Sequence, residues 1–108
     1  MKNINIIKKN HEFQKIISKR HFLKSKTLII YFLEAKDNFK YGISVGKKLG
    51  NAVIRNKVKR QIRMMIYNKL INLKEEKKHI IIMARNEYLK RSYEYNSNEL
   101  NRLLTKIC

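Results

Sequence analysis

Residues 46–63 constrain the fold of this chain more than any other stretch. A turn bounded by Gly46 and Gly50 leads to Asn51, a residue type that commonly caps helix N-termini. Beyond it, apolar residues recur at helical spacing within an arc of roughly 120°; they are Ile54, Val58, Ile62, Met65 and Ile66. The predicted helix therefore packs one side on another element, and its opposite side faces solvent.

The solvent side of this predicted helix is strongly basic. Residues 46–63 contain seven Lys or Arg, and residues 38–74 contain ten, with no Asp or Glu in either stretch. The whole chain has 26 Lys and Arg against eight Asp and Glu, a formal net charge of +18 and 44% hydrophobic residues, which indicates a folded basic domain. Because ion pairs within the segment cannot neutralise it, we expect a polyanionic partner, whose phosphates release counterions on binding.

A helix and a pair of strands are predicted before the basic segment. Residues 10–20 place apolar residues three and four apart, which predicts a first helix. Residues 27–33 form a β-branched and aromatic run that is typical of a strand buried on both faces. A turn separates this run from residues 39–45, which predict another strand. We expect the two strands to pair as a hairpin.

A strand and a helix are predicted after the basic segment. The basic helix is expected to run to about residue 73 and to be followed by a charged loop. Residues 79–85 include three consecutive isoleucines and predict a core strand. Ser92 or Ser97 is expected to cap a last helix with an apolar stripe. Since there is no proline, repeat or low-complexity linker, residues 1–108 are expected to form a single domain.

The residue types that commonly carry catalysis or bind metals are scattered. His11, His21 and His79 lack the spacing of metal ligands, and no nucleophile lies beside an evident base. Glu34 with Asp37, or Glu75 with Glu76, could hold Mg²⁺, but each pair occurs where a turn would expose charge to solvent in any case. We therefore expect a binding function, with no catalytic side chain and no metal site in the protein itself.

Cysteine usage and hydropathy indicate the cellular setting. Cys108 is the only cysteine, so the sequence provides neither a disulfide framework nor a cysteine-based zinc site. The apolar cluster of Ile4, Ile6 and Ile7 is too short for a membrane span or a signal-peptide core. We expect a cytoplasmic protein that does not contact membranes.

Structured RNA is favoured over DNA as the polyanion. A zipper-type basic region would need heptads downstream, and a helix-turn-helix motif would need helical neighbours, whereas predicted strands flank this helix. The closely spaced phosphates of RNA bind favourably to a rigid array of cations, and its unpaired bases can stack on aromatic side chains such as Phe13 and Tyr31. A structural RNA-binding protein of the ribosomal type and a DNA-binding regulator are the alternatives.

The basic segment resembles a family signature. The bacterial ribonuclease P protein subunit has a motif closely similar to Lys47-Lys48-x-Gly-Asn-Ala-Val-x-Arg55-Asn56-x-x-Lys59-Arg60-x-x-Arg63, including the Arg-Asn-x-x-Lys-Arg core. The resemblance extends to residues 8–15, 41–45 and 80–85, so it covers nearly the whole chain. Gly46 stands where the family commonly has Ser, and Lys57 stands where Arg is usual.

The resemblance implies an α/β (α+β) fold. Members of that family have a single two-layer domain with a mixed sheet of about four strands, helices on one face and the order α-β-β-β-α-β-α. The connection through the basic helix is a left-handed βαβ crossover, against the usual right-handed rule. This fold has one strand more than the residue patterns predict, and we place that strand near Phe22 and Leu23.

The resemblance also implies an activity. In that family the RNA subunit is the catalyst of an endoribonuclease and uses Mg²⁺ to free the mature 5′ end of tRNA, while the protein binds the catalytic RNA and the 5′ leader of precursor tRNA. Matched by position, the residues that face the RNA subunit are Lys47, Lys48, Arg55, Asn56, Lys57, Lys59, Arg60 and Arg63. The leader contacts are Lys9, Phe13, Ile17 and Tyr31, with Ile17 standing where an aromatic residue is frequent.

Overall fold

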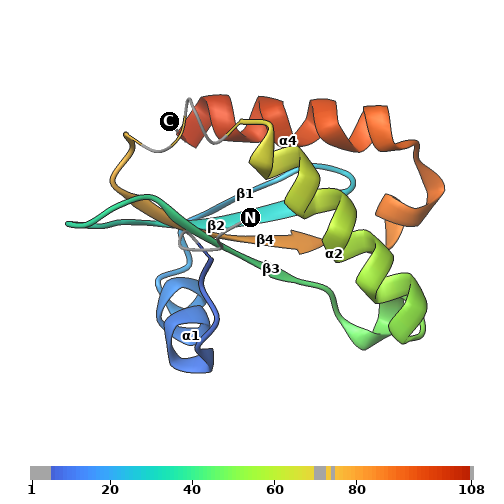
Figure 1. Cartoon of the computed structure of the whole chain (residues 1–108), viewed down its shortest axis with the longest axis horizontal. Helices are drawn as coiled ribbons and strands as arrows, with labels where there is room; N and C mark the ends of the chain where they lie inside the picture. Colours follow the sequence, from blue (N-terminus) through green and yellow to red (C-terminus); the bar gives the residue numbers. More distant parts are fainter. Residues whose placement is uncertain (1–5, 70–72, 74, 108) are drawn as a thin grey trace.

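The chain follows the predicted order of helices and strands (Figure 1). The computed structural model describes residues 6–69, 73 and 75–107. Its elements are α1 (Asn10–Ser18), β1 (Phe22–Lys24), β2 (Leu28–Glu34), β3 (Lys40–Ser44), η1 (Lys47–Leu49), α2 (Ala52–Tyr67), β4 (Lys78–Ala84), η2 (Asn86–Lys90) and α4 (Tyr93–Ile107), where η marks a 3-10 helix. The α-β-β-β-α-β-α order and the short strand near Phe22 are confirmed.

The four strands form one mixed sheet in the order β1-β2-β4-β3. β2 runs antiparallel to both of its neighbours, whereas β3 is parallel to β4. The predicted hairpin between residues 27–33 and 39–45 is therefore wrong, because β4 lies between β2 and β3. Ile80, Ile81 and Ile82 of β4 are fully buried. All three are removed from water because β4 is an inner strand of the sheet and both of its faces are covered.

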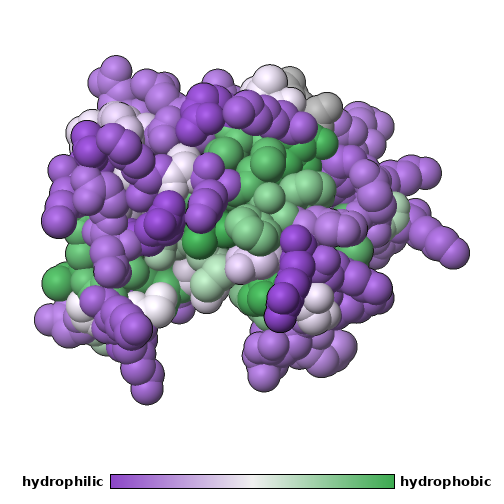
Figure 2. All heavy atoms as spheres, turned by 180° about the vertical axis from the view of Figure 1, so that it is seen from behind, coloured by the Kyte–Doolittle hydropathy of each residue, from purple (hydrophilic) through white to green (hydrophobic). Residues whose placement is uncertain are grey.

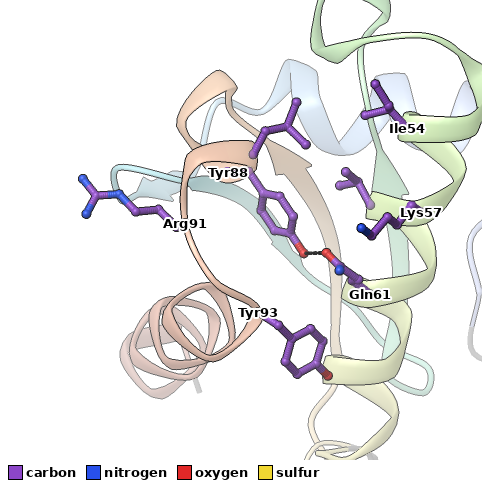
Figure 3. Close-up of a pocket in the computed structure, with 8 residues that line it drawn as sticks. Ile54, Lys57, Gln61, Tyr88, Arg91 and Tyr93 are labelled. Atoms are coloured by element: carbon purple, nitrogen blue, oxygen red, sulfur yellow. Dashed lines mark hydrogen bonds between the residues drawn. The ribbon is translucent and has the colours of Figure 1, made fainter.

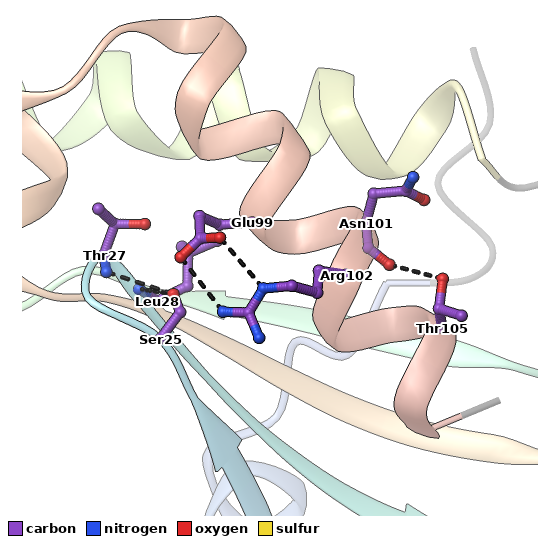
Figure 4. A network of polar contacts seen from close by, with 7 residues as sticks. All are labelled: Ser25, Thr27, Leu28, Glu99, Asn101, Arg102 and Thr105. Carbon is purple, nitrogen blue, oxygen red and sulfur yellow. Dashed lines mark hydrogen bonds and ion pairs between the residues drawn. The ribbon is translucent and has the colours of Figure 1, made fainter.

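β1 and β2 form the hairpin instead. Phe22 of β1 lies opposite Tyr31 of β2. In the turn between them, Ser25 Oγ accepts hydrogen bonds from the backbone N–H groups of Thr27 (3.3 Å) and Leu28 (3.2 Å). Figure 4 shows this turn beside α4, which contacts β2. The Ser25 side chain thus pairs two backbone N–H groups at the turn of the hairpin.

Helices cover both faces of the sheet (Figure 1). α2 and α4 pack on one face, where Ile80 and Ile82 belong to the larger core cluster; α1 packs on the other, where Ile16 joins Ile81. The expected two-layer arrangement with helices on one face is therefore wrong. Successive side chains of a strand point to opposite faces, so a run of three isoleucines needs an apolar layer on each side.

α2 has the predicted orientation about its axis. Asn51 Oδ1 accepts the backbone N–H of Ile54 (3.0 Å), which confirms the predicted N-cap. Val58, Ile62, Met65 and Ile66 are buried as predicted, but Ile54 is 37% exposed. Its turn of the helix lies past the ends of the strands (Figure 1), so the sheet does not cover it.

The boundaries of the later helices differ from those predicted. α2 ends at Tyr67 instead of continuing to about residue 73, and the start of the predicted loop, residue 74, lies outside the described residues. Ser92 caps the last helix, because its Oγ accepts the backbone N–H of Tyr95 (3.1 Å). α2 also connects β3 to its parallel neighbour β4, as in a βαβ crossover; the left-handed sense of that crossover stays a prediction.

Candidate nucleic-acid interface

The solvent side of α2 carries cations that form no ion pair with a carboxylate of the described residues. Asn56, Lys57, Arg60 and Arg63 are exposed, while Arg55 and Lys59 are partly exposed. Among the described residues, the carboxylates of the ion pairs are those of Glu34, Asp37, Glu87 and Glu99, and their partners all lie outside residues 46–63. The predicted basic face is therefore present and its charge is left for an external partner.

Arg55 lies at the border between the buried and the basic side of α2. Its Nε is buried and has no hydrogen-bond partner among the described residues. Buried donors are almost always paired in folded proteins. Because Nε is buried, the terminal Nη groups of Arg55 are the donors through which it can make a planar bidentate contact to a phosphate.

η1 places Lys47 and Lys48 beside the start of α2. Both side chains are exposed, and η1 contacts α2 and η2. Gly50 links η1 to α2 with a φ of +152°, and a Cβ at this position would lie 2.9 Å from Ile54 Cδ1. Glycine is favoured here because L side chains rarely adopt this backbone conformation, and a Cβ would also crowd the side chain of Ile54. The turn therefore holds two further cations next to the basic face.

The predicted leader residues gather on the α1 face of the sheet. Phe13, Ile17 and Tyr31 are partly buried hydrophobic residues of the same cluster, around Ile16 and Ile81. Lys9 is exposed and directly precedes α1. The structure therefore brings the three apolar members together and puts the cation at the end of the helix that carries two of them.

Phe22 extends this aromatic group and was missed by sequence reasoning. Its ring centroid lies 5.3 Å from that of Tyr31, with the planes inclined by 43°, and it is 43% exposed. The two residues face each other across the β1–β2 hairpin. The available signal was the short strand near Phe22, because pairing it with the next strand puts this ring beside Tyr31.

Glu34 and Asp37 are engaged by cations in this structure. Glu34 Oε1 lies 2.7 Å from Lys78 Nζ, and Asp37 lies 2.8 Å from His79 and 3.6 Å from Lys40. Desolvation alone would raise the pKa of Asp37, but the charge and hydrogen bond of His79 hold this pKa below its ordinary value. Among the described residues, no group of three metal-ligating side chains is gathered for a metal ion.

Hydrophilic side chains cover much of the face that Figure 2 shows. Seen from behind, they surround a group of hydrophobic side chains near the centre of that view (Figure 2). Within the described part of the chain, no helix has the length and apolar character needed to cross a membrane.

The fold and the unneutralised cationic helix define the class: a small α/β domain with a surface for a polyanion. The Ribonuclease P family model matches residues 1–108, and the chain belongs to this family. The ribonuclease P protein component of Mesoplasma florum is 53% identical over 107 residues, covering 98% of this chain and 97% of that protein.

Solved structures agree with this assignment. The structure of Staphylococcus aureus RNase P protein superimposes with a TM-score of 0.87 at 37% identity, covering 95% of this chain and 94% of that one. The RNase P protein from Thermotoga maritima, 21% identical, has the same fold, with a TM-score of 0.82 over 93% of this chain and 94% of that one. The chain is thus a tRNA-processing subunit that works with an RNA partner in a ribonuclease holoenzyme.

Proposed function

We propose that α2 and η1 bind the catalytic RNA subunit of the holoenzyme, with Lys47, Lys48, Arg55, Asn56, Lys57, Lys59, Arg60 and Arg63 as the contacts. The observation that carries this proposal is that, within the part of the chain that the structure describes, no ion pair includes a cation of this face; the carboxylates of Glu34, Asp37, Glu87 and Glu99 pair with cations elsewhere. A rigid helix holds the backbone positions of its cations at fixed spacing, so binding orders little of the backbone while phosphate counterions are released.

The RNA subunit, in this proposal, performs the hydrolysis with Mg²⁺ that it holds itself. The protein contributes positive charge, which lets RNA phosphates approach each other with fewer bound metal ions. Glu34 and Asp37 are already paired with cations, so they are poor candidates for metal ligands or general bases. The holoenzyme works in the cytoplasm, and DNA and membranes are not expected partners.

The α1 face binds the 5′ leader of precursor tRNA in the same proposal. Phe13 and Tyr31 supply aromatic surfaces on which unpaired bases can stack, and Lys9 supplies a cation at the start of α1. Ile17 offers apolar contact without a π face, so we expect modest leader affinity with little dependence on leader sequence.

Reconstitution tests the RNA-subunit proposal. Adding the protein to its cognate catalytic RNA should lower the Mg²⁺ concentration needed to cleave precursor tRNA, and the protein alone should not cleave. A structural RNA-binding protein would leave the Mg²⁺ requirement unchanged. Cleavage at the mature 5′ end by RNA-free protein would instead place the chemistry on protein side chains and overturn the proposal.

Precursor and mature tRNA together test the leader site. Phe13→Ala and Tyr31→Ala should each weaken holoenzyme binding to precursor by about 1–3 kcal/mol, the usual worth of a base–aromatic contact, and leave mature tRNA binding unchanged. Phe32→Ala is a matched control, because this neighbouring aromatic packs against the core on the other face of the sheet. Equal losses for precursor and mature tRNA would assign both aromatics to packing alone.

A further inference from the structure

A hollow of about 220 Å³ lies between α2, η2 and the start of α4 (Figure 3). The residues that shape its chemistry are Ile54, Lys57, Gln61, Tyr88, Leu89 and Tyr93. It is smaller than the roughly 300 Å³ of pockets that enclose a whole drug-sized ligand. Its size therefore suits a single planar group rather than a complete cofactor.

The polar side of this hollow is held together by a hydrogen bond between Tyr88 and Gln61. Tyr88 is 2% exposed, and its hydroxyl donates to Gln61 Oε1 (2.9 Å). Burial, together with nearby Tyr93, raises the pKa of Tyr88, so the phenol stays protonated and continues to donate. With its carbonyl occupied, Gln61 has its amide N–H groups left to offer. These amide N–H groups favour ligands that carry hydrogen-bond acceptors or negative charge.

Lys57 supplies the cation. Its amino group points toward the Tyr88–Gln61 pair (Figure 3), and it is in none of the ion pairs among the described residues. Arg91 also borders the hollow, but its guanidinium points away (Figure 3). It lies 3.0 Å from Glu87 Oε2 and 4.8 Å from the centre of the Tyr95 ring. The uncompensated charge is therefore that of Lys57.

The apolar side of the hollow is open to solvent. Leu89 is 48% exposed, Tyr93 40% and Ile54 37%. Tyr93 also presents a π face at the start of α4. A cation, amide donors and an accessible aromatic ring within one small hollow match the three parts of a nucleotide: phosphate, base edge and base face.

We propose that this hollow receives one unpaired nucleotide of the RNA partner, with the base against Tyr93 and Leu89 and the phosphate on Lys57. The proposal rests on the proposed RNA-binding role of α2, because Lys57 belongs to both the basic face and the hollow. It goes further by making η2 and α4 a second wall of the interface. Structured RNA is the favoured occupant because its loops and bulges present extruded bases to protein pockets.

A pair of charge-matched variants tests the site in the complex with the catalytic RNA. Leu89→Glu puts a carboxylate at the mouth of the hollow, and Asn101→Glu makes the same charge change at an exposed position on α4. Both residues are exposed, so both variants should fold. Leu89→Glu should weaken RNA binding about tenfold, whereas Asn101→Glu should stay within about twofold of wild type, since rim charges act weakly.

The outcomes separate this site from the proposed function. If wild type binds the catalytic RNA and lowers its Mg²⁺ requirement but both variants behave alike, the hollow is not part of the interface and only this proposal fails. If wild type itself neither binds nor lowers the requirement, the proposed function fails first. If Leu89→Glu weakens binding to the catalytic RNA and Asn101→Glu does not, the hollow is part of the interface.

A fluorescence experiment then distinguishes a base from a phosphate. The chain has no tryptophan, so Tyr93→Trp introduces a single reporter, and Asn101→Trp is the matched control. A short single-stranded oligoadenylate should quench Trp emission in Tyr93→Trp and not in Asn101→Trp. An abasic oligonucleotide of the same length should bind about tenfold more weakly to Tyr93→Trp, without quenching. Equal binding of both probes, or quenching of neither variant, would overturn the nucleotide site.

Discussion

Gly42→Ala is expected to push α1 away from the sheet. Gly42 lies in β3 opposite Ile81 of β4, and an added Cβ would lie 2.6 Å from Phe13 Cζ and 2.9 Å from Ile81 Cδ1. Overpacking of this kind costs about 1–3 kcal/mol. Alanine in a strand would otherwise gain about 0.5–1 kcal/mol over glycine. The two ranges combine to an expected loss of about 0–2.5 kcal/mol in the free energy of unfolding, centred on about 1 kcal/mol.

A double-mutant cycle isolates the contact with the ring. In a Phe13→Ala background the nearest obstacle is gone, so Gly42→Ala should cost at least about 1 kcal/mol less than in wild type. Gly46→Ala is the matched control, because a Cβ there meets nothing within 4 Å and φ is −71°. This control should be neutral or slightly stabilising. Urea unfolding at constant phosphate concentration measures all four proteins and the control.

The functional consequence follows from the same contact. A displaced Phe13 ring should weaken precursor tRNA binding and leave mature tRNA binding unchanged, if this ring contacts the leader. The packing argument is refuted if Gly42→Ala has the same effect on stability in both backgrounds. Such a result would mean that α1 does not hold the ring over β3 in solution.

Three further perturbations follow from the structure. Arg60→Ala or Arg63→Ala should weaken binding to the catalytic RNA by about 1–3 kcal/mol and flatten the salt slope by about one, with unchanged stability, as a salt titration of binding and a urea melt will show. Ser92→Ala should lower stability by about 1 kcal/mol because it removes an N-cap; an equal loss for Ser97→Ala would contradict this assignment. The lowered pKa of Asp37 contributes stability above about pH 4 that is lost as pH falls further, so the stability difference between wild type and Asp37→Asn should shrink below about pH 4 in acid unfolding.

The parts of the fold that the sequence predicted correctly depend on local signals. The side of α2 that faces the core follows from the spacing of apolar residues such as Val58 and Ile62. The N-cap at Asn51 follows from an Asn side chain that can accept the backbone N–H three residues later. Ile54 matched the same spacing and is nevertheless 37% exposed. Periodicity gives the direction of a side chain but not whether another element reaches that turn.

The errors concern pairings between distant segments. Two neighbouring strands joined by a short turn suggested a hairpin, and local reasoning could not show that β4 inserts between β2 and β3. The expectation of helices on one face came from the family resemblance. The isoleucine run in β4 argued against it, because alternate side chains such as Ile80 and Ile81 must enter different apolar layers.

In the candidate sites too, local features could be predicted from the sequence and features that join distant segments could not. The basic face lies within one helix, so its cations could be identified from the sequence by their spacing alone. The predicted leader residues come from both a helix and the sheet, and the family resemblance identified them. Phe22 could be added to them only once the β1–β2 register was known. The hollow beside α2 depends on Gln61 and Tyr88, which are far apart in the chain, so no local pattern could predict it.

The opposite placement of α1 and α2 has a consequence for how the subunit can work. With the sheet between them, the cations on α2 and the aromatic side chains of Phe13, Phe22 and Tyr31 on the α1 side face opposite directions from the domain. Charges separated by more than about 10 Å of solvent are largely screened at physiological salt, and the sheet has a tightly packed, incompressible interior. In the proposed holoenzyme the domain therefore acts as a rigid spacer that holds the leader at a fixed distance from the catalytic RNA. Each surface then binds with its own affinity, and it is their fixed separation, rather than any direct contact between them, that positions the scissile bond.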